Sequence, residues 1–218
     1  PAVSALIPRR VGRTEEAARQ MLLCGRRQAF WRLPNMLTAG RTALSVPLLM
    51  WCTQEPSWFL LVSGWLVFWI GDLLDGFAAR SLDLETRAGA LFDSVCDRVS
   101  MLWLLLALRA VTDWWSVWST AFVALFCVID LLISMSFLRL NLVSPIYFWL
   151  IDSPTWALNW HPIAKALSLA PFVLISVVES EKWAGSYCLL YLGVKAFSLG
   201  RISLLQPLGS GTHESEET

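Results

Sequence analysis

Four aspartates lie inside two apolar stretches of the chain, in pairs whose spacing matches the turn of a helix. Asp72 and Asp75 are three residues apart, and Asp93 and Asp97 are four apart, so each pair projects from one face of its helix. A carboxylate in an apolar membrane span costs about 3 kcal/mol on insertion scales, so four of them require a compensating partner. The linker between the stretches is short. We therefore expect the two helices to pack antiparallel with their aspartates opposed.

The chemistry that suits this cluster is that of hard divalent cations. Four carboxylates converging in a medium of low dielectric constant cannot all stay ionised without cations. The chain has only two His, neither near the cluster, which argues against an imidazole-rich zinc site. Oxygen ligands favour Mg²⁺ or Mn²⁺, with Ca²⁺ as a third candidate. Two such ions would neutralise the cluster and bind a diphosphate, which predicts a phosphoryl-transfer site.

The elements that carry the aspartates are predicted to be transmembrane helices. The 218 residues are 56% hydrophobic with a mean hydropathy of +0.56, above the roughly 45–50% apolar content of a soluble domain. The excess gathers into blocks of about 20 residues, the length of a membrane span, and many of the 13 Trp lie near block ends, as in an aromatic belt. We predict an all-α integral membrane fold with six spans, at 33–52, 58–79, 88–111, 115–138, 163–178 and 184–205. Five spans with a re-entrant segment is the alternative.

Charge asymmetry predicts the orientation of these helices. The formal net charge is zero, yet residues 1–32 carry seven Arg against two Glu, which favours a cytoplasmic N-terminus. The connections on the same side would then hold Arg80, Arg87, Arg139 and Lys165. We therefore expect a multi-pass protein with both termini and the acidic site on the cytoplasmic side, and no binding of nucleic acid by the basic arm.

Three segments are distinguished along the chain. Residues 1–32 are predicted to form a basic arm that includes an interfacial amphipathic helix at 14–32, which Thr14 can cap. Residues 33–206 are predicted to form the six-helix domain, and residues 207–218 a disordered polar tail.

The spacing around the aspartates matches a known signature. Residues 72–97 read DLLDGFAARSLDLETRAGALFDSVCD, which contains D-x₂-D-G-x₂-A-R-x₈-G-x₃-D-x₃-D without departure. From Leu33 onward the chain resembles the CDP-alcohol phosphatidyltransferase family. The resemblance implies a metal-dependent membrane enzyme that moves a phosphatidyl group from CDP-diacylglycerol to a small polar alcohol, releases CMP, and in this family often forms a homodimer.

The resemblance also implies roles for individual residues. The metal ligands would be Asp72, Asp75, Asp93 and Asp97, with Asp97 acting as the general base as well. The CDP moiety would be bound by Gly76, Ala79, Arg80 and Gly89, with Asn35 and Thr38 from the first span. Helix packing is the alternative role for the glycines, and capping of a helix start the alternative for Asn35 and Thr38.

The acceptor alcohol is less clearly indicated. An anionic acceptor requires cations near the site, and the candidates are Arg139 and Lys165, followed by Lys195 and Arg201. The segment FDSVCDR, in which Arg98 directly follows Asp97, resembles inositol-type members. Arg98 could equally be a structural partner for the carboxylates. The segment LPNMLTAGR at 33–41 instead resembles glycerol-phosphate and cardiolipin-type members. We favour inositol or inositol phosphate, with glycerol phosphate or a cardiolipin-type acceptor as the alternative.

A membrane transporter is the non-enzyme alternative, because intramembrane carboxylates also form cation and proton pathways. A transporter would distribute its acidic residues along a route through several helices. The four aspartates instead crowd into two.

Overall fold

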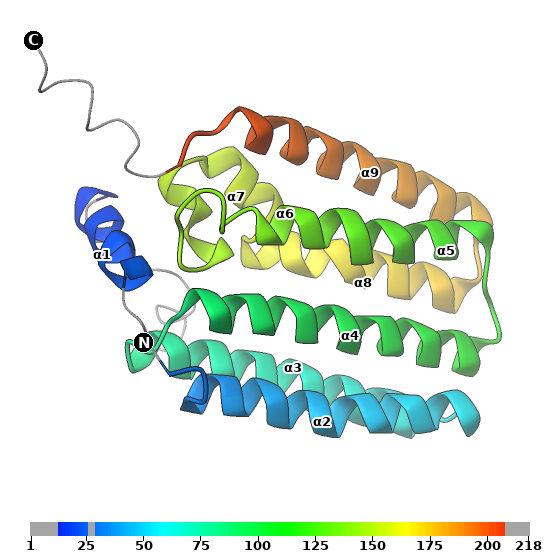
Figure 1. The fold of residues 1–218 in the computed structure, drawn as a ribbon. Helices are drawn as coiled ribbons and strands as arrows, with labels where there is room; N and C mark the ends of the chain where they lie inside the picture. The colour runs from blue at the N-terminus through cyan, green and yellow to red at the C-terminus, as the bar shows by residue number, and fades with distance from the viewer. Residues whose placement is uncertain (1–12, 26–28, 208–218) are drawn as a thin grey trace, which may run out of the picture.

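The computed structural model of the chain describes residues 13–25 and 29–207, and within these ranges the fold is entirely helical (Figure 1). The long helices are α2 (Leu33–Gln54), α3 (Trp58–Ser81), α4 (Arg87–Thr112), α8 (Pro162–Val178) and α9 (Glu181–Leu204). A further long helix consists of α5 (Val117–Ala124), the π-helical segment η2 (Leu125–Asp130) and α6 (Leu131–Met135). The short elements are α1 (Arg13–Gly25), the 3₁₀ helix η3 (Pro145–Leu150) and α7 (Ser153–Asn159).

The long helices run side by side, in two groups (Figure 1). The first group is α2, α3 and α4, in which α2 packs against both of the others. The second is formed by α5–η2–α6, α8 and α9. The short elements α1 and α7 lie at the end of the bundle where α2 and α4 begin. This end also holds the carboxyl terminus of α3, so both aspartate pairs lie in the half of the bundle nearest to it.

In the part of the chain that the structure describes, three helices are long and apolar enough to cross a membrane. They are Trp58–Ser81, Val117–Met135, and the consecutive α7 and α8 over Ser153–Val178. Large apolar side chains such as Phe59, Val117 and Leu174 are exposed on them, as expected of surfaces that face lipid. An all-helical fold with membrane-capable helices is therefore confirmed. The count of six spans is not, since α2, α4 and α9 are long enough but do not combine sufficient hydropathy with few charges.

The N-terminal helix differs from its predicted extent. It spans Arg13–Gly25, and residues 29–32 are not helical. The cause lies in the start of α2, because Pro34 in its first turn is preceded by extended backbone at Arg32. The side chain of Thr14, the predicted cap, is not among the described ones. The predicted arm before residue 13 and the predicted tail after residue 207 also lie outside the described residues.

The proline-bearing stretch between α6 and α8 forms η3 and α7 and contributes to the core. Phe137, Leu140, Leu142 and Phe148 are fully buried in it. The Phe148 and Trp160 rings stack with their centroids 4.1 Å apart. This compact segment forms part of the same end of the bundle as the aspartates.

Candidate active site

The two aspartate pairs face each other across α3 and α4, as their helical spacing predicts. Asp72, Asp75 and Asp93 each offer a carboxylate oxygen, and these oxygens lie within 4.8 Å of one another. Asp75 is buried, whereas the side chains of Asp72 and Asp93 are 30% and 39% exposed. The cluster is therefore rooted in the protein and open on one side.

A cation from α2, Arg41, joins the four carboxylates. Its Nε donates to Asp75 at 2.8 Å, and its Nη2 donates to Asp93 at 2.5 Å and to Asp97 at 2.7 Å. Asp72 lies 3.6 Å from the same Nη2. Sequence reasoning assigned Arg41 no role. A lone arginine in the apolar stretch 33–52 was the available signal, because such a charge also needs a partner.

The packing around Arg41 is specific to that side chain. A Cβ at Gly71 would come within 2.4 Å of the Arg41 Cβ, so the glycine leaves room for the guanidinium to cross from α2 to the acids. The guanidinium also lies over the Phe68 ring, 5.1 Å from its centroid. Its buried Nη1 has no hydrogen-bond partner among the described residues.

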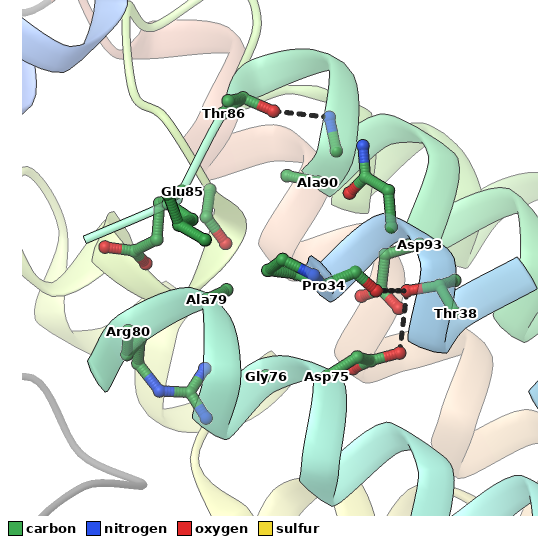
Figure 2. A pocket seen from close by; sticks show the side chains of 14 residues that line it. Pro34, Thr38, Asp75, Gly76, Ala79, Arg80, Glu85, Thr86, Ala90 and Asp93 are labelled. Carbon is green, nitrogen blue, oxygen red and sulfur yellow. Dashed lines mark hydrogen bonds between the residues drawn. The ribbon is translucent and has the colours of Figure 1, made fainter. Parts of the chain in front are cut away.

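A pocket adjoins the acidic cluster (Figure 2), with about 480 Å³ of empty space when the solvent at its open side is included. Asp75 and Asp93 lie at one end and Glu85 at the other, with Arg80 and Ala79 along the wall. The remaining lining residues are Gly76 of α3, residues of α2, of the connection between α3 and α4 and of the start of α4, and Ser144. The pocket thus combines acidic groups with a guanidinium on a turn of α3, a pairing suited to a metal-bound diphosphate.

All six residues predicted to bind the CDP moiety line this pocket: Asn35, Thr38, Gly76, Ala79, Arg80 and Gly89. The Thr38 hydroxyl contacts Asp75 Oδ2 at 2.7 Å, so it belongs to the acidic cluster as well. Asn35 donates to the Phe30 carbonyl at 2.7 Å, which ties the start of α2 to the segment before it, although no side chain caps this helix start. A Cβ at Gly89 would come within 2.7 Å of Asn35 Oδ1, so this glycine allows α2 and α4 to approach closely.

The cations predicted to bind the acceptor do not line this pocket. Arg139 donates to the carbonyls of Ser203 and Leu205 at 3.2 and 3.1 Å, and so contacts the end of α9. Lys165 is exposed near the start of α8, and its charge acts on the Asp97 carboxylate. Arg201 donates to Asp152 at 2.9 Å, and this contact lowers the pKa of Asp152 to about 2. Of these cations, Lys165 is the one placed to act on the acidic cluster.

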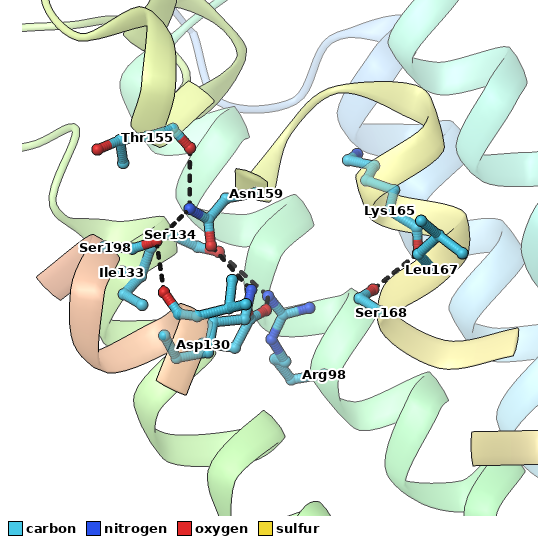
Figure 3. Close-up of polar contacts among 12 residues, drawn as sticks. Arg98, Asp130, Ile133, Ser134, Thr155, Asn159, Lys165, Leu167, Ser168 and Ser198 are labelled. Atoms are coloured by element: carbon cyan, nitrogen blue, oxygen red, sulfur yellow. Dashed lines mark hydrogen bonds and ion pairs between the residues drawn. The ribbon is translucent and has the colours of Figure 1, made fainter. Parts of the chain in front are cut away.

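A second buried polar network lies on the other face of α4 (Figure 3). Asp130 pairs with both Arg98 and Lys195. Lys195 also donates to Asn159 at 2.8 Å, and Asn159 in turn donates to Ser198 at 2.8 Å. The network connects α4, η2, α7 and α9. It accounts for Arg98 as a structural cation paired with Asp130, rather than with the four aspartates.

The donor set at the acidic cluster fits divalent metal ions. It consists of carboxylate oxygens, the ligands that Mg²⁺ and Mn²⁺ prefer. The three oxygens within 4.8 Å of one another are near enough for a common ion. Together with the fourth carboxylate and the adjoining pocket, this arrangement has the ligand set that metal-assisted phosphoryl transfer requires.

Comparison with known proteins identifies the family of this chain. Residues 31–194, well over half of the chain, match the model of the CDP-alcohol phosphatidyltransferase family. The chain belongs to this family, whose members use divalent metal ions. The predicted resemblance is confirmed, although the relatives are not of the inositol type. No solved structure matches the chain.

The similar curated proteins are phosphatidylglycerophosphate and cardiolipin enzymes. A chloroplastic CDP-diacylglycerol–glycerol-3-phosphate 3-phosphatidyltransferase of Oryza sativa subsp. japonica is 34% identical over 93 residues, 42% of this chain and 27% of that protein. An enzyme of the same name from Aquifex aeolicus is 35% identical over 75 residues, 34% of this chain and 42% of that protein. A cardiolipin synthase/mitochondrial hydrolase fusion protein of Schizosaccharomyces pombe is 34% identical over 87 residues, 38% of this chain and 14% of that protein. The chain thus spans less than half the length of each.

The position of Arg41 predicts how the protein responds to removal of metal. In EDTA, Arg41→Met should lower the free energy of unfolding by about 2 kcal/mol, since it leaves carboxylates without their internal cation but water screens the exposed ones. Saturating Mn²⁺ should restore most of the loss. Unfolding in mixed micelles measures both. Arg109→Met, a substitution of an exposed arginine at the far end of α4, is the control. A loss of equal size with and without Mn²⁺ would show that Arg41 does not neutralise the metal site.

Proposed function

We propose that this chain transfers a phosphatidyl group from CDP-diacylglycerol to a small polar alcohol and releases CMP. The observation that carries the proposal is the opposition of Asp72 and Asp75 on α3 to Asp93 and Asp97 on α4, next to a pocket that contains Arg80. The family match supports this reaction class. The curated relatives are enzymes that the chain covers only in part, so the activity of the whole protein is part of the proposal.

The mechanism assigns the proton transfer to Asp97. Its carboxylate takes the proton from the acceptor hydroxyl, and the alcohol oxygen then attacks the phosphorus that bears the diacylglycerol. The bond between that phosphorus and the bridging oxygen breaks, and CMP leaves with the electron pair. Arg80, on the pocket wall, would neutralise charge on the diphosphate. Arg41 would hold the carboxylates in register through its contacts with Asp75, Asp93 and Asp97.

Metal ions would be held by Asp72, Asp75, Asp93 and Asp97. We propose two ions, Mg²⁺ or Mn²⁺, because four carboxylates with one arginine leave an excess of negative charge. Cations must offset this excess before the anionic diphosphate of the donor can bind. When bound, the ions supply charge stabilisation for the transferring phosphoryl group and for the departing CMP.

We propose that six helices span the membrane, namely α2, α3, α4, α5–η2–α6, α8 and α9. Helices α2, α3 and α4 pack closely in one group. If one helix of this group spans the membrane, its neighbours of similar length would span it as well. The positive-inside rule supports placing the site and both termini on the cytoplasmic side. We further propose that α1 lies at the interface, that residues 33–206 form one domain, and that two chains form a homodimer.

For the acceptor, two candidates are carried forward. The relatives favour glycerol phosphate, since two of them are named for that substrate. The sequence argument for inositol rested on Arg98, and the pairing of Arg98 with Asp130 gives that residue a structural role that is independent of the acceptor. We therefore propose glycerol phosphate as the first candidate and inositol phosphate as the second. Lys165, whose charge acts on Asp97, would attract either anion.

The experiment is an acceptor panel with purified full-length protein. CDP-diacylglycerol and Mn²⁺ are combined separately with glycerol 3-phosphate, inositol 1-phosphate, inositol, serine or phosphatidylglycerol, and the lipid product is identified by mass spectrometry. We expect one phosphorylated acceptor to be preferred at least tenfold. In Lys165→Gln, its KM should rise by about tenfold with a smaller change in the KM for CDP-diacylglycerol. Equal KM values for wild type and Lys165→Gln would remove Lys165 from the acceptor site.

A further inference from the structure

The connection between α3 and α4 carries a buried carboxylate, Glu85, which lines the pocket and is held by a buried tyrosine of η3. Glu85, at 6% exposure, accepts hydrogen bonds from the Tyr147 hydroxyl at 3.0 Å to one oxygen and 2.8 Å to the other. Tyr147 belongs to η3 and is 2% exposed. Burial raises the pKa of Tyr147, so the hydroxyl remains protonated and can donate.

Helix α1 contacts the same connection. Arg19 pairs with Asp83 and lies 3.6 Å from Glu85 Oε2. Gln20, fully buried, accepts a hydrogen bond from the Val143 amide at 3.1 Å. Among the described side chains, α1 therefore makes polar contacts with the α3–α4 connection and with the segment before η3, and it also lies against η3.

The other side of the connection lines the pocket. Leu84, Glu85 and Thr86 all contribute to the pocket wall. Thr86 also caps α4 by accepting a hydrogen bond from the Gly89 amide at 2.9 Å, and Arg87 donates to the Leu142 carbonyl at 3.1 Å. Anything that moves the connection therefore moves both the wall of the pocket and the first turn of α4.

The connection lies at the end of the pocket away from the metal ligands. Figure 2 shows Asp75 and Asp93 on one side of the pocket and Glu85 on the other. The Asp pairs are held within the helices by Arg41, at a distance from the connection. A disturbance of the connection should therefore affect what binds along the pocket more than the chemistry at the aspartates.

We propose that Arg19, Glu85 and Tyr147 form a clamp that sets the affinity for the CDP-lipid donor. The inference rests on the proposed function, because it assigns the pocket to the donor. The three are positioning residues, which act through the α3–α4 connection: they hold Thr86 and the start of α4 where the donor's nucleotide end must fit. Groups that bind a ligand are most effective when hydrogen bonds behind them fix their position.

The test compares steady-state kinetics of the full-length protein with substitutions in the clamp. Tyr147→Phe removes only the hydroxyl that bonds Glu85. It should raise the KM for CDP-diacylglycerol by about tenfold, the effect of losing hydrogen bonds to a charged group, while kcat and the acceptor KM stay within about twofold. Arg19→Met should raise the donor KM by about threefold. Because Arg19 is 37% exposed, this variant should fold even if Tyr147→Phe does not.

Tyr187→Phe is the matched control, since it also removes one tyrosine hydrogen bond, from the Tyr187 hydroxyl to the Leu167 carbonyl at 2.6 Å, outside the pocket. Its donor KM should equal that of wild type. Binding of CMP in the presence of Mn²⁺, measured by calorimetry, should weaken in parallel with the donor KM in the clamp variants. Unchanged donor KM in both clamp variants, or equal rises in the donor and acceptor KM, would overturn the clamp. Absence of CMP release by wild type would instead overturn the proposed function.

Discussion

Asp97→Asn is expected to lower kcat for phosphatidyl transfer by about 10²–10⁴-fold, the range that a general base contributes. The asparagine Oδ1 can still accept the hydrogen bond that Arg41 Nη2 donates to Asp97 at 2.7 Å. The arrangement of α2 and α4 should therefore persist, and the loss should come from the missing base and from weaker metal binding. The initial rate of CMP release measures it, and CMP binding should persist.

A second substitution separates the two roles of Asp97. Asp93→Asn removes a proposed metal ligand that is not assigned as base, so a higher concentration of Mn²⁺ should recover a larger share of its rate than of the Asp97→Asn rate. Asp113→Asn is the control: it lies at the far end of α4 in a left-handed conformation that asparagine tolerates, and it should retain the wild-type rate. If Asp97→Asn released CMP as fast as wild type, Asp97 would not be the base.

Asp130→Ala is expected to lower the free energy of unfolding by about 3–5 kcal/mol, because it removes one partner of a buried ion-pair network. Asp130 pairs with Arg98 and Lys195, and the Lys195 side chain is only 3% exposed. Both cations would then lie in the bundle without their shared counter-ion. Unfolding in mixed micelles of mild and denaturing detergent provides the measurement, and Glu55→Ala, at the exposed end of α2, is the surface control.

A double substitution tests whether the cost arises from unpaired charge. Combining Asp130→Ala with Lys195→Met removes one of the two stranded cations, so the double variant should be less destabilised than the sum of the single variants. Strict additivity would show that Asp130 and Lys195 do not stabilise each other. A loss below 1 kcal/mol in Asp130→Ala would mean that water reaches the network and screens it.

The parts of the site that could be predicted from sequence are those set by local spacing. The separations of Asp72 from Asp75 and of Asp93 from Asp97 place each pair on one helix face, and the short connection opposes the pairs. The same reasoning could not identify the partners of Arg41, because its contacts depend on how α2 crosses α3 and α4, and on the space left at Gly71. Nor could it pair Glu85 with Tyr147, which come together only when η3 packs at the end of the bundle.

The bounds of the helices agree with the hydropathy prediction where the apolar stretch is uniform, and differ from it elsewhere. Trp58–Ser81 and Val117–Met135 lie close to their predicted ranges. The N-terminal helix was predicted too long because its composition continues beyond Gly25, whereas the backbone must become extended before the Pro34 turn. Glu16 and Gln20 of this helix are buried. An amphipathic pattern alone does not reveal that this polar face packs against the rest of the protein.

The central claim is that the four aspartates form a metal site for phosphatidyl transfer, and CMP release tests it most directly. Purified protein is given CDP-diacylglycerol with a mixture of soluble alcohols and phospholipids, so that the acceptor need not be known, and CMP is quantified with Mn²⁺, with Mg²⁺ and with EDTA. We predict release that requires a divalent ion and the donor, stops in EDTA, and falls at least a hundredfold in Asp97→Asn. Release that is undiminished in EDTA, or no release from well-folded wild type under any condition, would contradict the assignment.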